Sequence, residues 1–177
     1  MNRSAVLTHL PALRRYARAL TGDAWAADDL VQDTLERACA KWRLWLPGSD
    51  LRAWLFTLMH NLFLNQRRGA AARAVVVPLE DRHAELPGPA RDADIAIDLQ
   101  RCLLRLPAEQ RAVLLLVTLE DMAYADAARV LGVPVGTVMS RLSRARARLR
   151  ELMDEPASSA TPSPQAATGT APLRLAS

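Results

Sequence analysis

Hydroxyl and arginine side chains recur at helical spacing between residues 135 and 150. Projected at about 100° per residue, one side of this segment collects Thr137, Ser140, Arg141, Arg144 and Arg148. The opposite side collects the apolar Val138, Leu142, Ala145 and Leu149. A guanidinium can grip a guanine edge or a phosphate through two hydrogen bonds at once. The segment therefore predicts a helix that packs through its apolar stripe and presents a basic face suited to DNA.

The residues before this helix predict a short helix and a turn that would position it in a groove of DNA. We expect a short helix over 124–131, a tight turn at Gly132, and a second helix over 135–153. The small side chains of Ala127 and Ala128 would let the two helices cross closely. This combination is typical of a helix-turn-helix, in which the second helix enters the major groove.

A solvated basic face on a structural helix is the alternative interpretation of the same arginines. The turn, the small residues and the facing of the side chains together favour major-groove binding. Arg146 and Arg150 lie on the flank of the helix, where phosphate contact and simple solvation both stay open.

A second charged face, of opposite sign, is predicted over residues 26–38. Its members share one side of a helix: Asp28, Asp29, Gln32, Asp33 and Glu36. The other side is apolar and is expected to be buried: Ala27, Leu30, Val31, Thr34 and Ala38. An acidic face repels phosphate and favours a basic protein partner, although a solvated surface is the simpler alternative.

Aromatic and basic side chains alternate over residues 42–68. Aromatic rings beside positive charge suit unpaired bases, which stack on rings while arginines neutralise the backbone. We expect part of this segment to be core, with a buried stripe of Trp54, Leu55, Leu58 and Leu62. Asn61 and Asn65 lie four residues apart near Arg68, where paired amides could contact base edges or remain solvated.

Seven helical segments and no convincing strand are predicted, which makes the fold all-α: 4–21, 24–44, 51–68, 95–105, 108–119, 124–131 and 135–153. Asp23 and Asp50 are the expected N-caps of the second and third segments. Proline, glycine and charge divide the chain into two small helical domains, 1–69 and 95–155, a flexible linker over 70–94 and a disordered tail over 156–177.

Composition excludes several classes of protein. The 177 residues are 50% hydrophobic and 24% charged, with a net charge of +4, and Lys41 is the only lysine among 23 basic residues. No segment predicts a membrane span or a signal peptide, so we expect a cytoplasmic protein. Cys39 and Cys102 are interpreted as two buried thiols. His9, His60 and His83 have no metal-ligand spacing, and we expect His60 to be a helix-surface or packed residue.

No nucleophile motif or glycine-rich phosphate loop appears, so an enzyme is the weakest hypothesis and neither a cofactor nor a metal is expected.

Three strings closely resemble bacterial sigma factors of the extracytoplasmic-function (ECF) group: DDLVQDTLERA, LRAWLFTLMHNLFLNQRR and YADAARVLGVPVGTVMSRLSRARARL. The resemblance covers about residues 5–69 and 95–153. It implies that the first domain, region 2, docks on the clamp helices of core RNA polymerase and melts and captures the promoter's minus-ten element. The second domain, region 4, would bind the minus-thirty-five element as duplex DNA and touch the polymerase flap.

The resemblance also implies roles for particular residues. The core polymerase contact would comprise Asp28, Asp29, Leu30, Gln32 and Asp33. The minus-ten element would be contacted by Trp45, Ser49, Asn61, Asn65, Arg67 and Arg68. The minus-thirty-five element would be contacted by Thr137, Ser140, Arg141, Arg144 and Arg148. Relatives of this kind are often held inactive by an anti-sigma factor, so such a partner is implied as well.

Two other functions fit parts of the sequence. A sigma-mimicking protein could sequester an anti-sigma factor, although such mimics usually carry a control domain. A dimeric helix-turn-helix repressor could use the same basic helix, but it would need neither the acidic face nor the aromatic segment.

Overall fold

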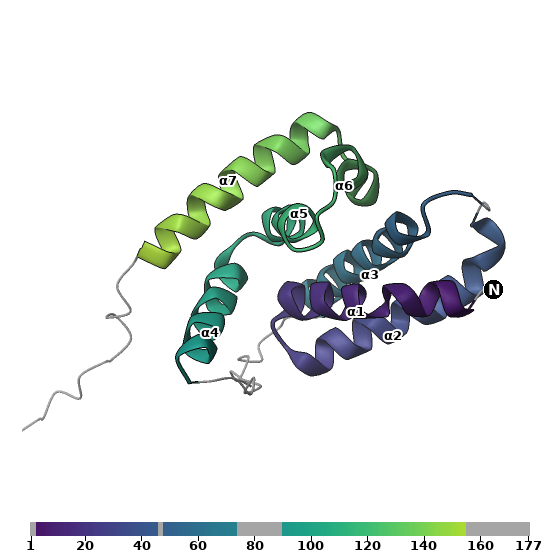
Figure 1. The fold of residues 1–177 in the computed structure, drawn as a ribbon, viewed down its shortest axis with the longest axis horizontal. Helices are drawn as coiled ribbons and strands as arrows, with labels where there is room; N and C mark the ends of the chain where they lie inside the picture. The colour runs from purple at the N-terminus through teal and green to yellow at the C-terminus, as the bar shows by residue number, and fades with distance from the viewer. Residues whose placement is uncertain (1–2, 46–47, 74–89, 155–177) are drawn as a thin grey trace, which may run out of the picture.

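The computed structural model describes residues 3–45, 48–73 and 90–154, and every regular element within them is helical (Figure 1). The all-α prediction is confirmed. The elements are α1 (Arg3–Thr21), α2 (Ala24–Lys41), a 3₁₀ turn (Trp42–Leu44), α3 (Leu51–Arg73), α4 (Ala90–Arg105), α5 (Ala108–Thr118), α6 (Tyr124–Leu131) and α7 (Val135–Asp154).

Helices α1, α2 and α3 pack against one another, and we call them the N-terminal unit. Their shared core includes Leu13, Leu20 and Leu30, each with no exposed surface. Tyr16 of α1 meets Phe56 of α3 edge to face, with ring centroids 5.2 Å apart. The apolar side of α2 is buried as the sequence predicts, so the acidic side of that helix faces outward.

Side-chain caps begin two of these helices where the sequence predicts them. Asp23 Oδ1 accepts a hydrogen bond of 2.7 Å from the Ala26 N–H at the start of α2. Asp50 Oδ1 accepts one of 3.1 Å from the Ala53 N–H at the start of α3. Each carboxylate satisfies a backbone donor that the first helical turn leaves without an intrahelical partner.

Helices α4 to α7 form the C-terminal unit, whose last two helices make the predicted helix-turn-helix. Gly132 ends α6 with φ of 65°, a left-handed conformation that residues with a Cβ adopt only at a cost. Helices α6 and α7 pack against each other, and Ala127, Ala128 and Val138 are all buried, as the predicted close crossing requires.

Two helices are longer than predicted. Helix α3 continues to Arg73 and α4 begins at Ala90, so residues 70–73 and 90–94 of the predicted linker are helical. The alanines at 70–72 have the highest helix propensity of any residue and extend α3 beyond the predicted end. The rest of the predicted linker, 74–89, and the predicted disordered tail lie outside the described residues.

The buried stripe of α3 differs from the prediction. Leu55 is buried, but Trp54, Leu58 and Leu62 are only half-buried. Further fully or almost fully buried side chains of this helix are Phe56, Met59, His60 and Phe63. Helix α3 contacts α2 and α1 in its own unit and also α6 of the other unit, so its buried surface is broader than one stripe.

The prediction of two buried thiols is wrong for Cys39, which is exposed, while Cys102 is half-buried. Cys39 follows Asp28 by about three helical turns and therefore lies on the same outward side of α2. Cys102 Sγ lies 3.5 Å from the Leu152 backbone oxygen, between α4 and α7.

The two units pack directly against each other, which the sequence does not reveal. Helix α6 lies against α3, and α4 and α5 lie against α1 (Figure 1). Gly22, between α1 and α2, illustrates how close the approach is. A Cβ at this position would lie 2.5 Å from Leu104 Cδ1 of α4, and its φ of 77° also favours glycine.

Candidate nucleic-acid and polymerase interfaces

The basic side of α7 is open to solvent over most of its length. Arg144 is exposed, and Arg148 is exposed while paired with Glu151 at 2.9 Å. Ser140 is exposed and donates a hydrogen bond of 3.1 Å to the Thr137 backbone oxygen. Thr137 itself is half-buried in the first turn of the helix. The helix therefore presents hydroxyls and two guanidiniums on one side, as the projection predicts.

Arg141 behaves differently from the other arginines of this face. Its guanidinium is paired with the Glu109 carboxylate of α5, and only 24% of its side chain is exposed. Four of the five predicted contacts therefore share an accessible side of α7, and the fifth is drawn back against α5.

The flanking arginines lie beside a shallow hollow. Arg146 and Arg150 border it, and Arg150 Nε donates a hydrogen bond of 3.2 Å to the Arg146 backbone oxygen. The hollow has a volume of about 210 Å³, and its other walls are Tyr124, Met139, Leu142 and Ser143. Both arginines thus lie on another side of α7 from Arg144.

The acidic side of α2 is exposed, and part of it is held in place by neighbouring helices. Asp29 is exposed, and Asp28 lies 3.8 Å from the Arg18 guanidinium of α1. Asp33 accepts a hydrogen bond of 3.0 Å from the Gln66 amide of α3. Gln32 and Glu36 hydrogen-bond to each other at 3.1 Å, which completes the predicted face.

Leu30 is the exception among the predicted polymerase contacts. Its side chain has no exposed surface, because it belongs to the apolar side of α2 that packs in the core of the N-terminal unit. Leu30 therefore supports the acidic face from beneath and is not part of the surface.

Trp25 was missed by the sequence analysis. It lies in the first turn of α2, three and four residues before Asp28 and Asp29, and it is 84% exposed. Residues at these spacings share one side of a helix, and this spacing was the signal available in the sequence. A large ring so fully exposed beside carboxylates is the kind of side chain that dominates protein interfaces.

The predicted minus-ten contacts fall in two places along α3. Trp45 and Ser49 lie just before the helix begins, and Trp45 is half-buried against Trp42 with ring centroids 4.9 Å apart. The remaining members lie from the middle of the helix onward and are exposed: Asn61, Asn65, Arg67 and Arg68. The distance along the helix axis from Leu51 to Asn61 is about 15 Å, so the two places are separate.

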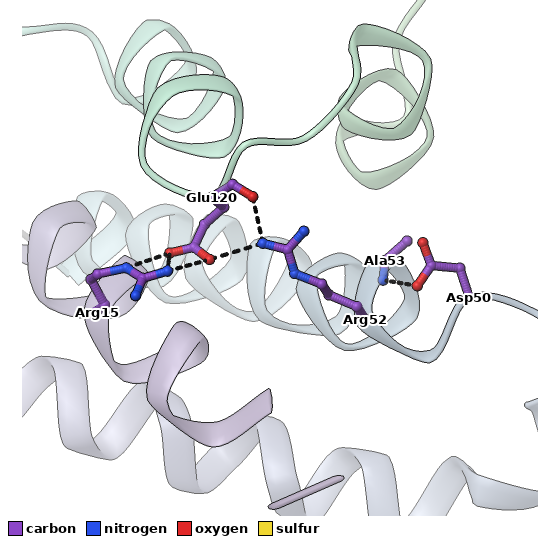
Figure 2. Close-up of polar contacts among 5 residues, drawn as sticks. All are labelled: Arg15, Asp50, Arg52, Ala53 and Glu120. Atoms are coloured by element: carbon purple, nitrogen blue, oxygen red, sulfur yellow. Dashed lines mark hydrogen bonds and ion pairs between the residues drawn. The ribbon is translucent and has the colours of Figure 1, made fainter. Parts of the chain in front are cut away.

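A charged cluster that the sequence does not reveal joins the two units (Figure 2). The Glu120 side chain, just after α5, has no exposed surface. Arg15 of α1 donates to both of its oxygens, from Nε at 3.0 Å to Oε1 and from Nη2 at 3.0 Å to Oε2. Arg52 of α3 donates from Nη2 at 3.0 Å to Oε2 and also to the Glu120 backbone oxygen. One buried carboxylate thus holds two guanidiniums of the other unit (Figure 2).

Three further ionisable groups are buried where the two units meet. The pKa of Tyr16 is raised, mainly by burial and to a smaller extent by the Glu120 carboxylate. The pKa of Arg111 is lowered to about 10, mainly by burial and to a smaller extent by the Arg67 guanidinium. The pKa of His60 is lowered to about 4, mainly by burial and to a smaller extent by the Arg141 guanidinium. The Glu109 carboxylate has the opposite, raising effect on this pKa. His60 is therefore a packed residue and not a helix-surface one, which settles the alternative left open above.

An exposed basic side on a helix-turn-helix is typical of a helical DNA-binding protein, and the acidic side of α2 is a second, separate surface. Comparison with known families agrees with this class. The family described as "Sigma2 domain of PhyR" matches residues 6–60, and the family described as "Sigma-70, region 4" matches residues 96–149.

Relatives cover most of the chain. The ECF RNA polymerase sigma factor EcfG of Rhodopseudomonas palustris is 40% identical over 154 residues, which are 85% of this chain and 84% of that protein. The ECF RNA polymerase sigma factor SigM of Mycobacterium tuberculosis is 38% identical over 145 residues, 82% of this chain and 73% of that protein. The chain belongs to the ECF family of RNA polymerase sigma factors.

A solved structure shows the same arrangement of helices. The sigma factor RpoE from Bartonella quintana, solved in complex with the anti-sigma factor NepR, is 35% identical with a TM-score of 0.69. The match covers 85% of this chain and 95% of that one.

Within residues 3–45, 48–73 and 90–154, no helix is both long and apolar enough to cross a membrane. The same ranges contain no group of three or more histidine, cysteine or acidic side chains that could hold a metal ion.

We predict that His60 makes folding stability depend on pH. Because its pKa lies below the ordinary 6.5 in the folded chain, the unfolded chain takes up the proton first as the pH falls. The contribution is complete above about pH 6.5 and is lost between about pH 6.5 and 4, by up to about 3 kcal/mol. His60→Met removes the ionisable group, so its free energy of unfolding should fall less over this interval.

Urea unfolding followed by circular dichroism at three pH values between about 5 and 7 measures this difference. His9→Met, at a half-exposed histidine of α1, is the matched control and should keep the pH dependence of the parent. Equal pH dependence in His60→Met and the parent would contradict the assignment to His60.

Proposed function

We propose that this sigma factor directs core RNA polymerase to specific promoters, with α7 on the minus-thirty-five duplex and the N-terminal unit on the minus-ten element. It acts in the cytoplasm, where the polymerase is, and it has no catalysis of its own. The observation that carries the proposal is the pairing in one chain of an exposed basic recognition helix with an exposed acidic face on a separate unit.

The minus-thirty-five contact is assigned to the exposed side of α7. Arg144 and Arg148 can reach base edges or phosphates, and Thr137 and Ser140 add hydroxyls near the N-terminal end of the helix. Backbone N–H groups of that end are oriented to meet a phosphate of the DNA backbone. Arg141 joins these contacts once it leaves Glu109.

The polymerase contact is assigned to the acidic side of α2. Asp28, Asp29 and Asp33 supply negative charge for a basic surface such as that expected of the polymerase clamp helices, and Trp25 adds an apolar anchor beside them. Gln32 contributes an amide on the same side. The flap contact that the resemblance implies is assigned to the C-terminal unit as a whole.

The minus-ten contact is assigned to two places on the N-terminal unit. Trp45 and Ser49 before α3 would receive unpaired bases, while the exposed amides of Asn61 and Asn65 contact base edges. Arg67 and Arg68 neutralise the nearby backbone; the Arg67 guanidinium lies 5.9 Å from the Phe63 ring centroid.

An anti-sigma factor is proposed as a further partner. RpoE of Bartonella quintana was solved with the anti-sigma factor NepR, and CnrH, 30% identical to this chain with a TM-score of 0.64, was solved with the cytosolic domain of CnrY. Both matches cover 85% of this chain, which supports a partner of the same kind.

Transcription in vitro with purified core polymerase tests the proposal. A genomic promoter library should yield promoter-dependent transcripts only when the chain is added, and a library without any such transcript would contradict the function. The match to the Sigma2 domain of PhyR favours one alternative function, that of a sigma mimic. A mimic would capture an anti-sigma factor in a pull-down and fail to capture polymerase.

We predict that Arg144→Ala weakens binding of a minus-thirty-five duplex about tenfold or more, because an arginine contact to a base edge is worth roughly 1–3 kcal/mol. Fluorescence anisotropy with a labelled duplex, taken from a promoter found in the library, measures the affinity. Arg101→Ala removes the same charge from the exposed side of α4 and should change the affinity little. An equal loss in both variants would mean that net charge, and not a contact of Arg144, governs binding.

We predict that Asp33→Arg and Trp25→Ala each weaken binding to core polymerase while leaving the minus-thirty-five duplex affinity unchanged. Asp33→Arg inverts a charge of the acidic face, and Trp25→Ala removes an exposed ring whose loss at an interface costs about 2 kcal/mol or more. Competition against a labelled sigma factor for core polymerase measures the effect. Leu7→Ala truncates a comparably exposed apolar side chain of α1 and serves as the control. Loss of duplex binding in Asp33→Arg would contradict the division between the two surfaces.

A further inference from the structure

A large apolar side chain is exposed near the N-terminal end of α7, beside the predicted DNA contacts. Met139 is the fifth residue of the helix, it directly precedes Ser140, and it is 54% exposed. Ser143, one helical turn further along, is also exposed. Both residues line the hollow, whose opposite wall is Tyr124, the first residue of α6. Met139 therefore offers an apolar surface directly beside the hydroxyls and arginines assigned to DNA.

The charge of the hollow favours a nucleic acid as its occupant. Arg146 and Arg150 line it, both are exposed, and none of the residues that line it is acidic. Residues 139, 143, 146 and 150 follow one another at spacings of four, three and four, so they form one row along α7. The row begins with an apolar side chain and ends, roughly 16 Å further along the helix, with two guanidiniums. A polyanion that carries an apolar group near its phosphates matches such a row.

The order of side chains in this row fits the major groove of duplex DNA. In a helix-turn-helix, N-terminal residues of the second helix contact base edges, and other parts of the unit contact the phosphate backbone. Met139 lies in the part of α7 that would reach bases, whereas Arg146 and Arg150 lie two to three turns later. Of the four bases, thymine alone presents a methyl group in this groove. An unbranched thioether side chain can contact that methyl group without leaving a polar group unpaired.

We propose that Met139 is a specificity-determining residue that recognises the C5 methyl group of a thymine in the minus-thirty-five duplex, while Arg146 and Arg150 bind a phosphate of the same duplex. The proposal rests on the function proposed above, because it needs the basic side of α7 in the major groove. Contact between the thioether and the methyl group removes both from water, and this contact is lost at cytosine, which has no methyl group. The two flanking arginines, whose role the sequence leaves open, are thereby assigned to phosphate.

Replacement of thymine by deoxyuridine tests the contact, because it removes the methyl group and leaves every hydrogen-bonding group in place. The thymines on both strands of a minus-thirty-five duplex from the promoter library are replaced one at a time, and fluorescence anisotropy measures the affinity of the full chain. We expect one replacement to weaken binding of the parent about fourfold, which is the effect of losing one buried methyl-sized group. Met139→Ala should bind the thymine and deoxyuridine duplexes of that position equally well. Met139→Leu, which stays apolar and of similar size, should keep most of the difference.

Met153→Ala is the matched control. Met153 is the same type of residue on the same helix and is 55% exposed, but it lies about 21 Å further along α7 than Met139. The control variant should keep the parent's sensitivity to deoxyuridine at every position of the duplex. Equal loss of this sensitivity in Met139→Ala and Met153→Ala would overturn the proposal, because the effect would then not depend on a contact near the N-terminal end of the helix.

The salt dependence of binding tests the two arginines of the row. Arg146→Ala and Arg150→Ala should each weaken binding to all duplexes alike and reduce the slope of log affinity against log salt concentration by about 1. Arg101→Ala, on the exposed side of α4, should leave this slope unchanged. An unchanged slope in both Arg146→Ala and Arg150→Ala would overturn the phosphate contact.

The remaining outcomes separate this proposal from the function on which it rests. Specific duplex binding that is indifferent to deoxyuridine at every position would overturn the proposal alone, as would a bound element without thymine on either strand. Weaker competition of Met139→Ala for core polymerase, with unchanged sensitivity to deoxyuridine, would assign Met139 to a protein interface and also overturn the proposal. Absence of promoter-dependent transcription with the parent chain would instead contradict the proposed function.

Discussion

An ionised carboxylate is costly to bury unless opposite charge or hydrogen bonds compensate it, and this constraint organises the contact between the two halves of the molecule. Transfer of an unpaired carboxylate from water into a protein interior costs several kcal/mol or more. Glu120 avoids that cost only because Arg15 and Arg52 reach it from α1 and α3 (Figure 2). The geometry on the Arg15 side is bidentate, the strongest form of such a pair. These three side chains therefore form a specific charged contact within the packed interface of the two units.

The apolar contacts between the units reinforce this position. Gly22 lets Leu104 of α4 approach the turn between α1 and α2 so closely that a Cβ there would make the leucine side chain shift. Nearby, Tyr16 uses its ring in the core of the N-terminal unit while its hydroxyl lies buried beside Glu120 and Arg111. The interface is therefore mixed: well-packed apolar contacts at some points and imperfectly satisfied polar groups at others. Such interfaces resemble those between domains that move relative to each other.

Local structure was predictable from the sequence because its determinants are local. The caps at Asp23 and Asp50, the turn at Gly132 and the apolar stripe of α7 all depend on residues within a few positions of one another. The contact between Arg15 and Glu120 spans 105 residues, and nothing in the sequence around Glu120 distinguishes it from a solvated loop carboxylate. For the same reason the stripe of α3 was predicted imperfectly: α6, far along the chain, covers part of that helix.

The site residues also divide into those whose exposure depends on local structure and those whose exposure depends on long-range contacts. Arg144 and Arg148 were placed correctly because helical projection alone decides which way they face. Arg141 has the same projection, yet Glu109 of α5 draws it inward, so its availability depends on a tertiary contact. Two carboxylates of the C-terminal unit pair with guanidiniums: Glu109 with Arg141 of α7, and Glu120 with Arg15 and Arg52 of the N-terminal unit. A phosphate that approaches the basic side of α7 would compete with Glu109 for the Arg141 guanidinium, whereas no DNA contact is proposed for Arg15 or Arg52.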